Sequence, residues 1–172
     1  MTRLKIVVSD SSVLMDLARV RLIEATLALP FDFVIPDVIF VGELLDLGAY
    51  TSGDLVRLGF RIGALGGDDT GRALAYFRQH RRQLSLNDCF ALRFAEVHEG
   101  ILMTGDGYLR KIATDGGVEV HGTLWAVELM AQHGTCPSRQ LSTSLELLDG
   151  DPLVRLPRHA LRALKTKLGS TG

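Results

Sequence analysis

Two aspartates lie at the ends of short apolar segments that have the pattern of strands. Catalytic and ligand-binding side chains are common at the ends of strands. Asp10 closes the segment LKIVVSD, and Asp106 follows ILMT in the segment ILMTGDG. If both segments are strands of one parallel sheet, right-handed connections bring their carboxyl ends to the same edge, where ligands bind in open sheets. We therefore expect Asp10 and Asp106 to share a cleft, although 96 residues separate them along the chain.

Two further acids, Asp88 and Glu43, lie in segments with a helical pattern. Asp88 comes three residues after Ser85, so an alternative interpretation of this acid is a helix capping box. Glu43 belongs to the only polar stripe of the apolar segment 37–47, and this stripe faces either a cleft or solvent. Ordinary turns would also account for Asp10 and Asp106, but four such coincidences at one edge are less expected than one shared site.

Carboxylates that gather in one place repel one another and raise each other's pKa unless a cation is present. Oxygen ligands alone suit Mg²⁺ or Mn²⁺ rather than zinc. The five histidines show no paired spacing typical of zinc sites, and we assign none of them to a metal. The sequence thus predicts a Mg²⁺ or Mn²⁺ site among the carboxylates of Asp10, Glu43, Asp88 and Asp106.

Alternating apolar runs and helical patterns predict the elements that position these acids. They indicate an α/β fold, a three-layer α/β/α sandwich around a mainly parallel central sheet. Strands are expected at residues 4–9, 33–35, 61–65, 101–104 and 118–121. Helices are expected at residues 12–28, 37–47, 69–82, 85–98, 106–113 and 123–133.

The chain of 172 residues is long enough for one domain and an appendage. After Cys136-Pro137, two amphipathic segments around an Asp-Gly-Asp-Pro turn predict a helical C-terminal extension, so we expect a domain at 1–135 and the extension at 136–172. With 19 Lys and Arg against 20 Asp and Glu, the overall charge indicates no partner. Two cysteines without C-x-x-C spacing, no secretory signal and no membrane-spanning segment predict a cytoplasmic protein.

Four segments, taken together and in this order, resemble the PIN-domain ribonucleases, a family that includes the VapC-type toxins of prokaryotic toxin/antitoxin systems. They are VVSDSSVLMDL, IPDVIFVGELL, LSLNDCFALRFA and ILMTGDGYLRKIA, within about residues 4 to 135. The resemblance implies a PIN-like fold. It also implies that the family's catalytic, metal-binding quartet corresponds to Asp10, Glu43, Asp88 and Asp106. Thr104 and Ser11 would be polar residues that support this quartet.

The activity implied by this resemblance is metal-dependent hydrolysis of RNA phosphodiester bonds, in which the protein acts as an endoribonuclease. A polyanionic substrate needs cations beside the acids, and the arginine-rich stretch from residue 57 to 82 offers Arg78, Arg81 and Arg82. The alternative is that these arginines cover a solvated helix face. If the protein is a toxin, a protein antitoxin is expected as its partner, and a homodimer is expected from the family.

Two alternative functions compete with the ribonuclease. One is a non-catalytic PIN-like module that binds RNA or a partner protein and retains the acids. The other is a phosphatase of the haloacid-dehalogenase kind, which also begins with an apolar strand ending in aspartate. That class needs a second acid two residues after the first, where this chain has Ser12, so the residues disfavour it.

Overall fold

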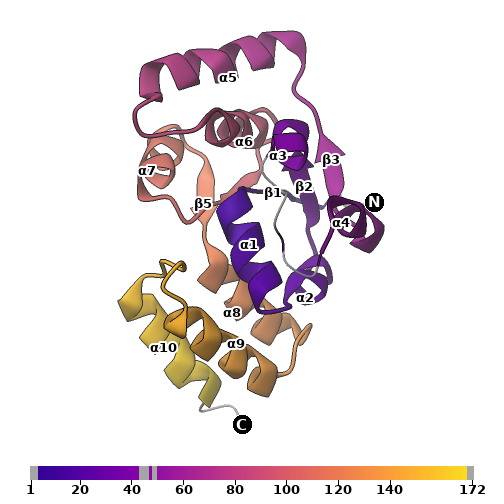
Figure 1. The fold of residues 1–172 in the computed structure, drawn as a ribbon, viewed down its shortest axis with the longest axis vertical. Helices are drawn as coiled ribbons and strands as arrows, with labels where there is room; N and C mark the ends of the chain where they lie inside the picture. The colour runs from indigo at the N-terminus through magenta and orange to yellow at the C-terminus, as the bar shows by residue number, and fades with distance from the viewer. Residues whose placement is uncertain (1–3, 43–46, 48–49, 170–172) are drawn as a thin grey trace.

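A five-stranded sheet forms the centre of the protein, in a computed structural model that describes residues 4–42, 47 and 50–169. The strand order is β3-β2-β1-β4-β5, and all neighbouring strands run parallel (Figure 1). The strands are β1 (Ile6–Ser9), β2 (Asp32–Pro36), β3 (Arg61–Gly63), β4 (Ile101–Met103) and β5 (Glu119–His121). Both β1 and β4 are buried along their whole length, as expected for strands covered on two faces. The predicted parallel α/β fold is confirmed.

Helices cover both faces of this sheet (Figure 1). They are α1 (Ser11–Arg19), α2 (Ile23–Leu27), α3 (Asp37–Gly42), α4 (Ser52–Leu58), α5 (Gly67–His80), α6 (Leu86–Val97), α7 (Gly107–Asp115), α8 (Thr123–His133), α9 (Ser138–Gly150) and α10 (Arg158–Gly169). On one face α6 packs against β1, β2 and β4, and α5 lies outside α6. On the other face α1, α2 and α8 contact one another. The three-layer arrangement is therefore also confirmed.

The carboxyl ends of β1 and β4 lie side by side at one edge of the sheet. Ser9 is in register with Met103, and the Asp10 N–H donates to the Met103 carbonyl at 3.0 Å. The helices α1, α7 and α8 begin at this edge because each follows a strand, and α6 begins there because it runs back into β4. The N-termini of these helices, which favour negative charge, thus lie at the edge of the sheet where Asp10 leaves it.

The helix expected at residues 12–28 is instead two helices, α1 and α2. Arg21 has a φ of 56°, in the left-handed region that a continuous helix excludes. The Leu22 N–H donates to the Leu17 carbonyl at 2.9 Å, and the side chains of Leu22 and Ile23 are fully buried. Burial of these two apolar residues accounts for the turn, which the helical pattern alone did not reveal.

Two other expectations about helices need correction. The helix α4 was not predicted, although the Thr51–Asp54 capping box that starts it is visible in the sequence. The helix expected at 37–47 does not include Leu47, which forms an isolated antiparallel bridge with Tyr50. Residues 43–46 lie outside the described part of the chain.

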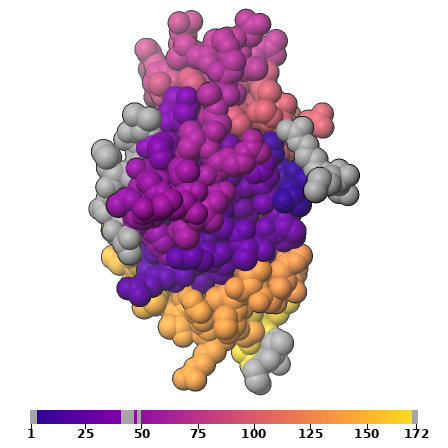
Figure 2. Space-filling view, turned by 90° about the vertical axis from the view of Figure 1, so that its right-hand side faces the viewer, coloured from indigo at the N-terminus to yellow at the C-terminus, as the bar shows by residue number. Residues whose placement is uncertain are grey.

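The C-terminal segment forms one end of the molecule, opposite to α5 (Figure 2). The two predicted helices are present as α9 and α10, which pack against each other and against α8. Their buried leucines, such as Leu145 and Leu161, belong to the same apolar cluster as the sheet. The division into 1–135 and 136–172 stays a prediction. No helix in the described ranges has the length and apolar character that crossing a bilayer requires.

Candidate functional site

Asp10 is a buried carboxylate at the junction of β1 and α1. It is the N-cap of α1, and its Oδ1 accepts hydrogen bonds from the Val13 N–H at 2.9 Å and the Ser12 hydroxyl at 2.8 Å. Only 4% of the residue is exposed, and this burial raises the pKa of its carboxyl despite the hydrogen bonds. No Lys, Arg or His in the described residues forms an ion pair with Asp10. The site therefore holds a desolvated acid without a protein cation.

Thr104 connects Asp10 to Asp106. The Thr104 side chain is fully buried, hydrogen-bonds to the Asp10 carboxyl, and accepts a hydrogen bond from the Asp106 N–H at 3.0 Å. Asp106 is exposed, caps α7, and accepts the Leu109 N–H on Oδ1 at 2.7 Å. One hydroxyl thus connects the Asp10 carboxyl to the backbone of the loop that carries Asp106.

Asp88 is a helix cap, which is one of the two interpretations that its sequence position left open, and its role in a metal site stays a prediction. It forms a capping box with Ser85, in which its Oδ2 accepts from the Ser85 N–H at 2.7 Å and from the Ser85 hydroxyl at 2.8 Å. Its negative charge also raises the pKa of the Asp10 carboxyl. Asp88 is therefore a helix cap that faces the same buried acid.

The other expected site residues are placed less directly. Glu43 lies outside the described residues. Ser11 is the first residue of α1 and is half-buried. The hydroxyl of its neighbour Ser12 donates to Asp10 Oδ1. Within the ranges that the structure covers, no three His, Cys, Asp or Glu side chains gather closely enough to hold a metal ion. Glu43 is not among those side chains.

Asp16 is a half-buried acid near the site that sequence reasoning missed. Its Oδ2 accepts a hydrogen bond from the Thr123 hydroxyl at 3.2 Å. Burial raises the pKa of its carboxyl to about 6, and the charge of Asp10 adds to this effect. The available signal was its spacing: Asp16 follows Ser12 by four residues, so both lie on the same face of α1.

The arginines expected to bind RNA lie beside this edge. Arg78, Arg81 and Arg82 are exposed, at the end of α5 and just after it. No acidic side chain of the described chain pairs with any of the three. The end of α5 is tied to the start of α7 by a 3.0 Å contact between His80 Nδ1 and the Tyr108 hydroxyl, two residues after Asp106. The basic segment, residues 78–82, is therefore anchored next to the start of α7, where Asp106 lies.

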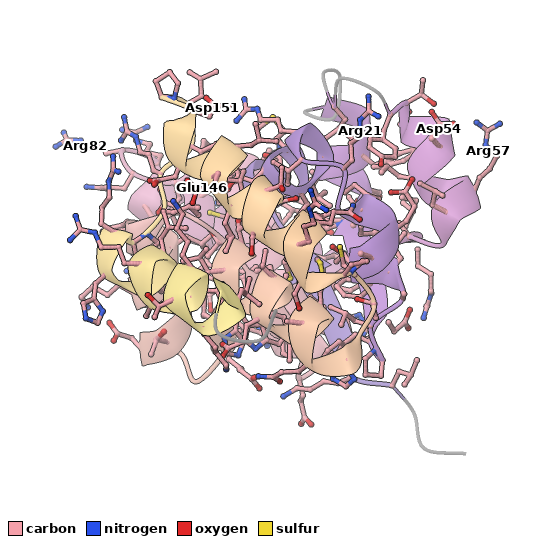
Figure 3. All side chains as sticks on the ribbon, turned by 90° about the horizontal axis from the view of Figure 1, so that it is seen from below. Arg21, Asp54, Arg57, Arg82, Glu146 and Asp151 are labelled. Carbon is pink, nitrogen blue, oxygen red and sulfur yellow. The ribbon has the colours of Figure 1, made fainter. Side chains whose placement is uncertain are left out.

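The remaining arginines of this stretch behave differently. Arg57 pairs with Asp54 within α4, and Arg61 pairs with Asp32 across β3 and β2. Viewed from below, Arg57 and Arg82 project from opposite sides of the molecule (Figure 3). Arg57 and Arg61 are thus neutralised by acids, whereas Arg78, Arg81 and Arg82 carry charge that no acid neutralises in the described structure.

Comparison with known protein families gives a match over nearly the whole chain. The family model DUF3368, described as a PIN domain, matches residues 6–170. The matched range includes the two C-terminal helices. No curated protein matches the sequence.

Proposed function

Because the chain belongs to the PIN-domain family, whose members are generally nucleases, we propose that it is a metal-dependent endoribonuclease. The observation that carries this proposal is the Thr104 hydroxyl, which contacts the Asp10 carboxyl and the Asp106 backbone. It connects the Asp10 carboxyl to the loop that carries Asp106, at the edge of the sheet where ligands bind in folds of this kind. A toxin role, an antitoxin partner and a homodimer stay predictions.

Asp10 and Asp106 supply carboxylate oxygens, the ligands that a hard divalent cation prefers, although the described residues contain no cluster of three such ligands. Asp10 is buried with a raised pKa and has no cationic partner among the described residues, and a bound metal ion would offset the cost of keeping it charged. Asp106 keeps one oxygen, Oδ2, without a hydrogen-bond partner among the described residues. Asp10 and Asp106 would hold Mg²⁺ or Mn²⁺ directly, with Asp88 and Glu43 directly or through water. When bound, such an ion lowers the pKa of a water molecule and neutralises charge on the phosphate.

The chain's own residues would prepare the site for this chemistry. Ser12 and Thr104 hold the Asp10 carboxylate in one orientation, and Thr104 also fixes the loop that carries Asp106. Such supporting hydrogen bonds typically contribute about 10- to 100-fold in metal affinity or activity. The N-termini of α1, α6 and α7 direct backbone N–H groups toward this edge, which favours an incoming phosphate.

Substrate attraction would come from the basic segment. Arg78, Arg81 and Arg82 have no acidic partner in the described chain, and the contact between His80 and Tyr108 anchors them beside Asp106. Cations that are not neutralised internally remain available to phosphates of a bound strand. We therefore propose that these three arginines bind the RNA backbone beside the acidic edge, which is the edge of the sheet that carries Asp10 and Asp106.

The test is Mn²⁺-dependent cleavage of RNA by the wild type and by Asp106→Asn. Asparagine is as good an N-cap as aspartate, so α7 should be retained while one metal ligand is lost. We expect the cleavage rate to fall at least about a hundredfold. Asp115→Asn, at the exposed C-terminal end of α7, is the matched control and should keep the wild-type rate.

Equal cleavage by Asp106→Asn and the wild type would remove the mechanism. Wild-type protein that binds RNA but leaves it uncut in both Mg²⁺ and Mn²⁺ would favour the non-catalytic RNA-binding module instead.

A further inference from the structure

A pocket of about 350 Å³ opens directly beside the acidic edge. Thr104 and Gly105, which lead from β4 to Asp106, form part of its wall. Asp16 from α1 and residues 155–157 from the segment before α10 form other parts. The volume lies in the range of small-molecule sites, and the C-terminal segment completes the pocket. We call it the Trp125 pocket, after the aromatic residue in its wall.

Two guanidinium groups line the Trp125 pocket without a carboxylate partner in the described structure. Arg110 donates to the backbone carbonyls of Thr104 at 3.1 Å and Val120 at 3.4 Å, which leave its positive charge in place. Gly122 makes room for this arginine, since a Cβ there would lie 3.2 Å from Arg110 Nη2. Arg155 is exposed on the pocket wall and makes no hydrogen bond or ion pair with described residues. Two guanidinium groups that line one pocket suit a ligand with a phosphate group.

The same pocket offers a carboxylate acceptor. Asp16 accepts the Thr123 hydroxyl on Oδ2, and its Oδ1 lies 3.7 Å from Arg19 Nη1. A carboxylate has about four acceptor positions on its two oxygens, so these contacts leave capacity for further donors. The charge pattern of the pocket therefore fits a ligand with N–H donors in one part and a phosphate in another.

The remaining wall is apolar and includes an aromatic ring. Trp125 is held by a parallel stack on His121, with ring centroids 4.2 Å apart and 5° between the planes. Leu124, Leu156 and Pro157 add aliphatic surface. Aromatic and aliphatic walls with a few polar groups are how proteins hold an unstacked nucleobase of single-stranded RNA.

We propose that the Trp125 pocket binds one guanosine nucleotide of the RNA strand, beside the phosphate that the acidic edge would cleave. Guanine alone among the four bases presents two adjacent N–H donors on its pairing edge, and these match the two oxygens of the Asp16 carboxylate. Arg110 and Arg155 contact the phosphate of the same nucleotide. This assignment builds on the proposed ribonuclease function and gives it a base preference.

The test uses the intrinsic fluorescence of Trp125, the only tryptophan of the chain. The full-length protein is titrated in EDTA with GMP, AMP, CMP and UMP, and with oligouridine carrying one guanosine or none. We expect saturable quenching, with GMP about tenfold tighter than the other three nucleotides. The guanosine-containing oligonucleotide should bind at least as tightly as GMP, because RNA is the proposed source of the base.

Two variants with matched controls separate the roles of the pocket residues. Asp16→Asn should bring the affinity for GMP down to that for AMP, whereas Asp115→Asn should keep the preference. Arg155→Ala should lower the affinity for all four nucleoside monophosphates about threefold or more. The affinity for guanosine, which lacks the phosphate, should not change. Arg158→Ala is its control, since Arg158 pairs with Asp149 and does not line this pocket. Arg155 is exposed, so its variant tests the pocket independently of any change in stability that Asp16→Asn causes.

The outcomes distinguish this inference from the ribonuclease itself. Absence of saturable quenching, or equal affinity for the four nucleotides, would contradict guanosine binding in the Trp125 pocket even if the protein cleaves RNA in Mn²⁺. GMP binding without binding of the guanosine-containing oligonucleotide would overturn RNA as the source. Guanosine-selective binding that depends on Asp16 would support the pocket even if no cleavage is detected, because the measurement in EDTA requires no catalysis.

Discussion

Two regions of the protein, around α4 and around the start of α6, contain the same motif in different electrostatic surroundings. Each helix begins with a capping box, Thr51–Asp54 or Ser85–Asp88, with reciprocal side-chain and backbone hydrogen bonds. Hydrogen bonds from Thr51 and the guanidinium of Arg57 lower the pKa of the Asp54 carboxyl to about 2. Asp88 instead lies near a buried carboxylate, whose pKa its charge raises.

The arginines of the two regions also differ in whether an acidic side chain neutralises them. Near α4, Arg57 and Arg61 are each paired with an acid. Near α6, Arg81 and Arg82 have no acidic partner in the described chain. The charges of the first region are neutralised locally, whereas under the proposed function those of the second would serve a metal ion and a polyanion. A capping box therefore does not reveal by itself whether its acid also serves a site, and the surroundings decide.

The strongest test of this comparison is removal of the two capping charges. Asp88→Asn should lower Mn²⁺-dependent RNA cleavage about a thousandfold, or about 4 kcal/mol, because a carboxylate facing the metal position is lost. Asp54→Asn should change the rate less than about twofold, since Asp54 is engaged by Arg57. Both variants keep a side chain that accepts hydrogen bonds, and circular dichroism should show equal helix content. Equal cleavage by the two variants would leave Asp88 as a cap alone.

Asp16→Asn should raise the free energy of unfolding by up to about 3 kcal/mol at neutral pH. Asp16 contrasts with Asp54, because the pKa of Asp16 is raised whereas that of Asp54 is lowered. The Asp16 carboxyl has a pKa of about 6 in the folded protein against an ordinary value of 3.8, because it is buried. Since its folded pKa is raised, the charged form opposes folding above both values, and below 3.8 this cost vanishes. The gain from Asp16→Asn should therefore appear as pH rises from about 4 to about 6 and stay constant above.

Urea unfolding of wild type and Asp16→Asn across this pH range measures the difference. Asp115→Asn, an exposed position, should stay within about 0.5 kcal/mol of the wild type throughout. A gain from Asp16→Asn that does not change with pH would contradict the assignment of the effect to a buried charge.

The arginines allow a third, smaller test. The double variant Arg81→Ala, Arg82→Ala should weaken RNA binding about tenfold at low salt and reduce the slope of log affinity against log salt by about 2, because two phosphate contacts are lost. Binding is measured in EDTA by fluorescence anisotropy between about 50 and about 200 mM salt. The matched double variant Arg57→Ala, Arg61→Ala should keep the wild-type slope. The same slope in both double variants would return Arg81 and Arg82 to a solvated helix face.

The convergence of Asp10 and Asp106 was predictable because it follows from topology alone. Each acid ends a buried apolar strand, and parallel strands bring such ends to one edge. The helix at 123–133 was also predicted with the bounds it has in the structure. These features depend on hydrophobic pattern and connection rules, both of which a single sequence carries.

Other features depend on contacts between distant segments. Arg61 meets Asp32 only because β3 pairs with β2 in a particular register, so its neutralisation was not visible in the sequence. The break at Arg21 reflects burial of its neighbours rather than a helix-breaking residue. The role of Asp16 required knowing that α1 and α8 meet, where Thr123 donates to it. Spacing shows which residues share an element, but not which elements touch.

The smallest effect is expected from removal of the N-cap hydroxyls of α4 and α6. Ser85→Ala and Thr51→Ala should each lower the free energy of unfolding by about 1 kcal/mol, because each helix loses the acceptor for an N-terminal N–H. Only Ser85→Ala should also lower RNA cleavage, by about tenfold, since Ser85 donates to Asp88 Oδ2 and holds that carboxylate in place. Urea unfolding and initial cleavage rates of the two variants separate these effects. Equal losses of stability with unchanged cleavage in both would mean that the cap of α6 supports the helix without positioning its acid.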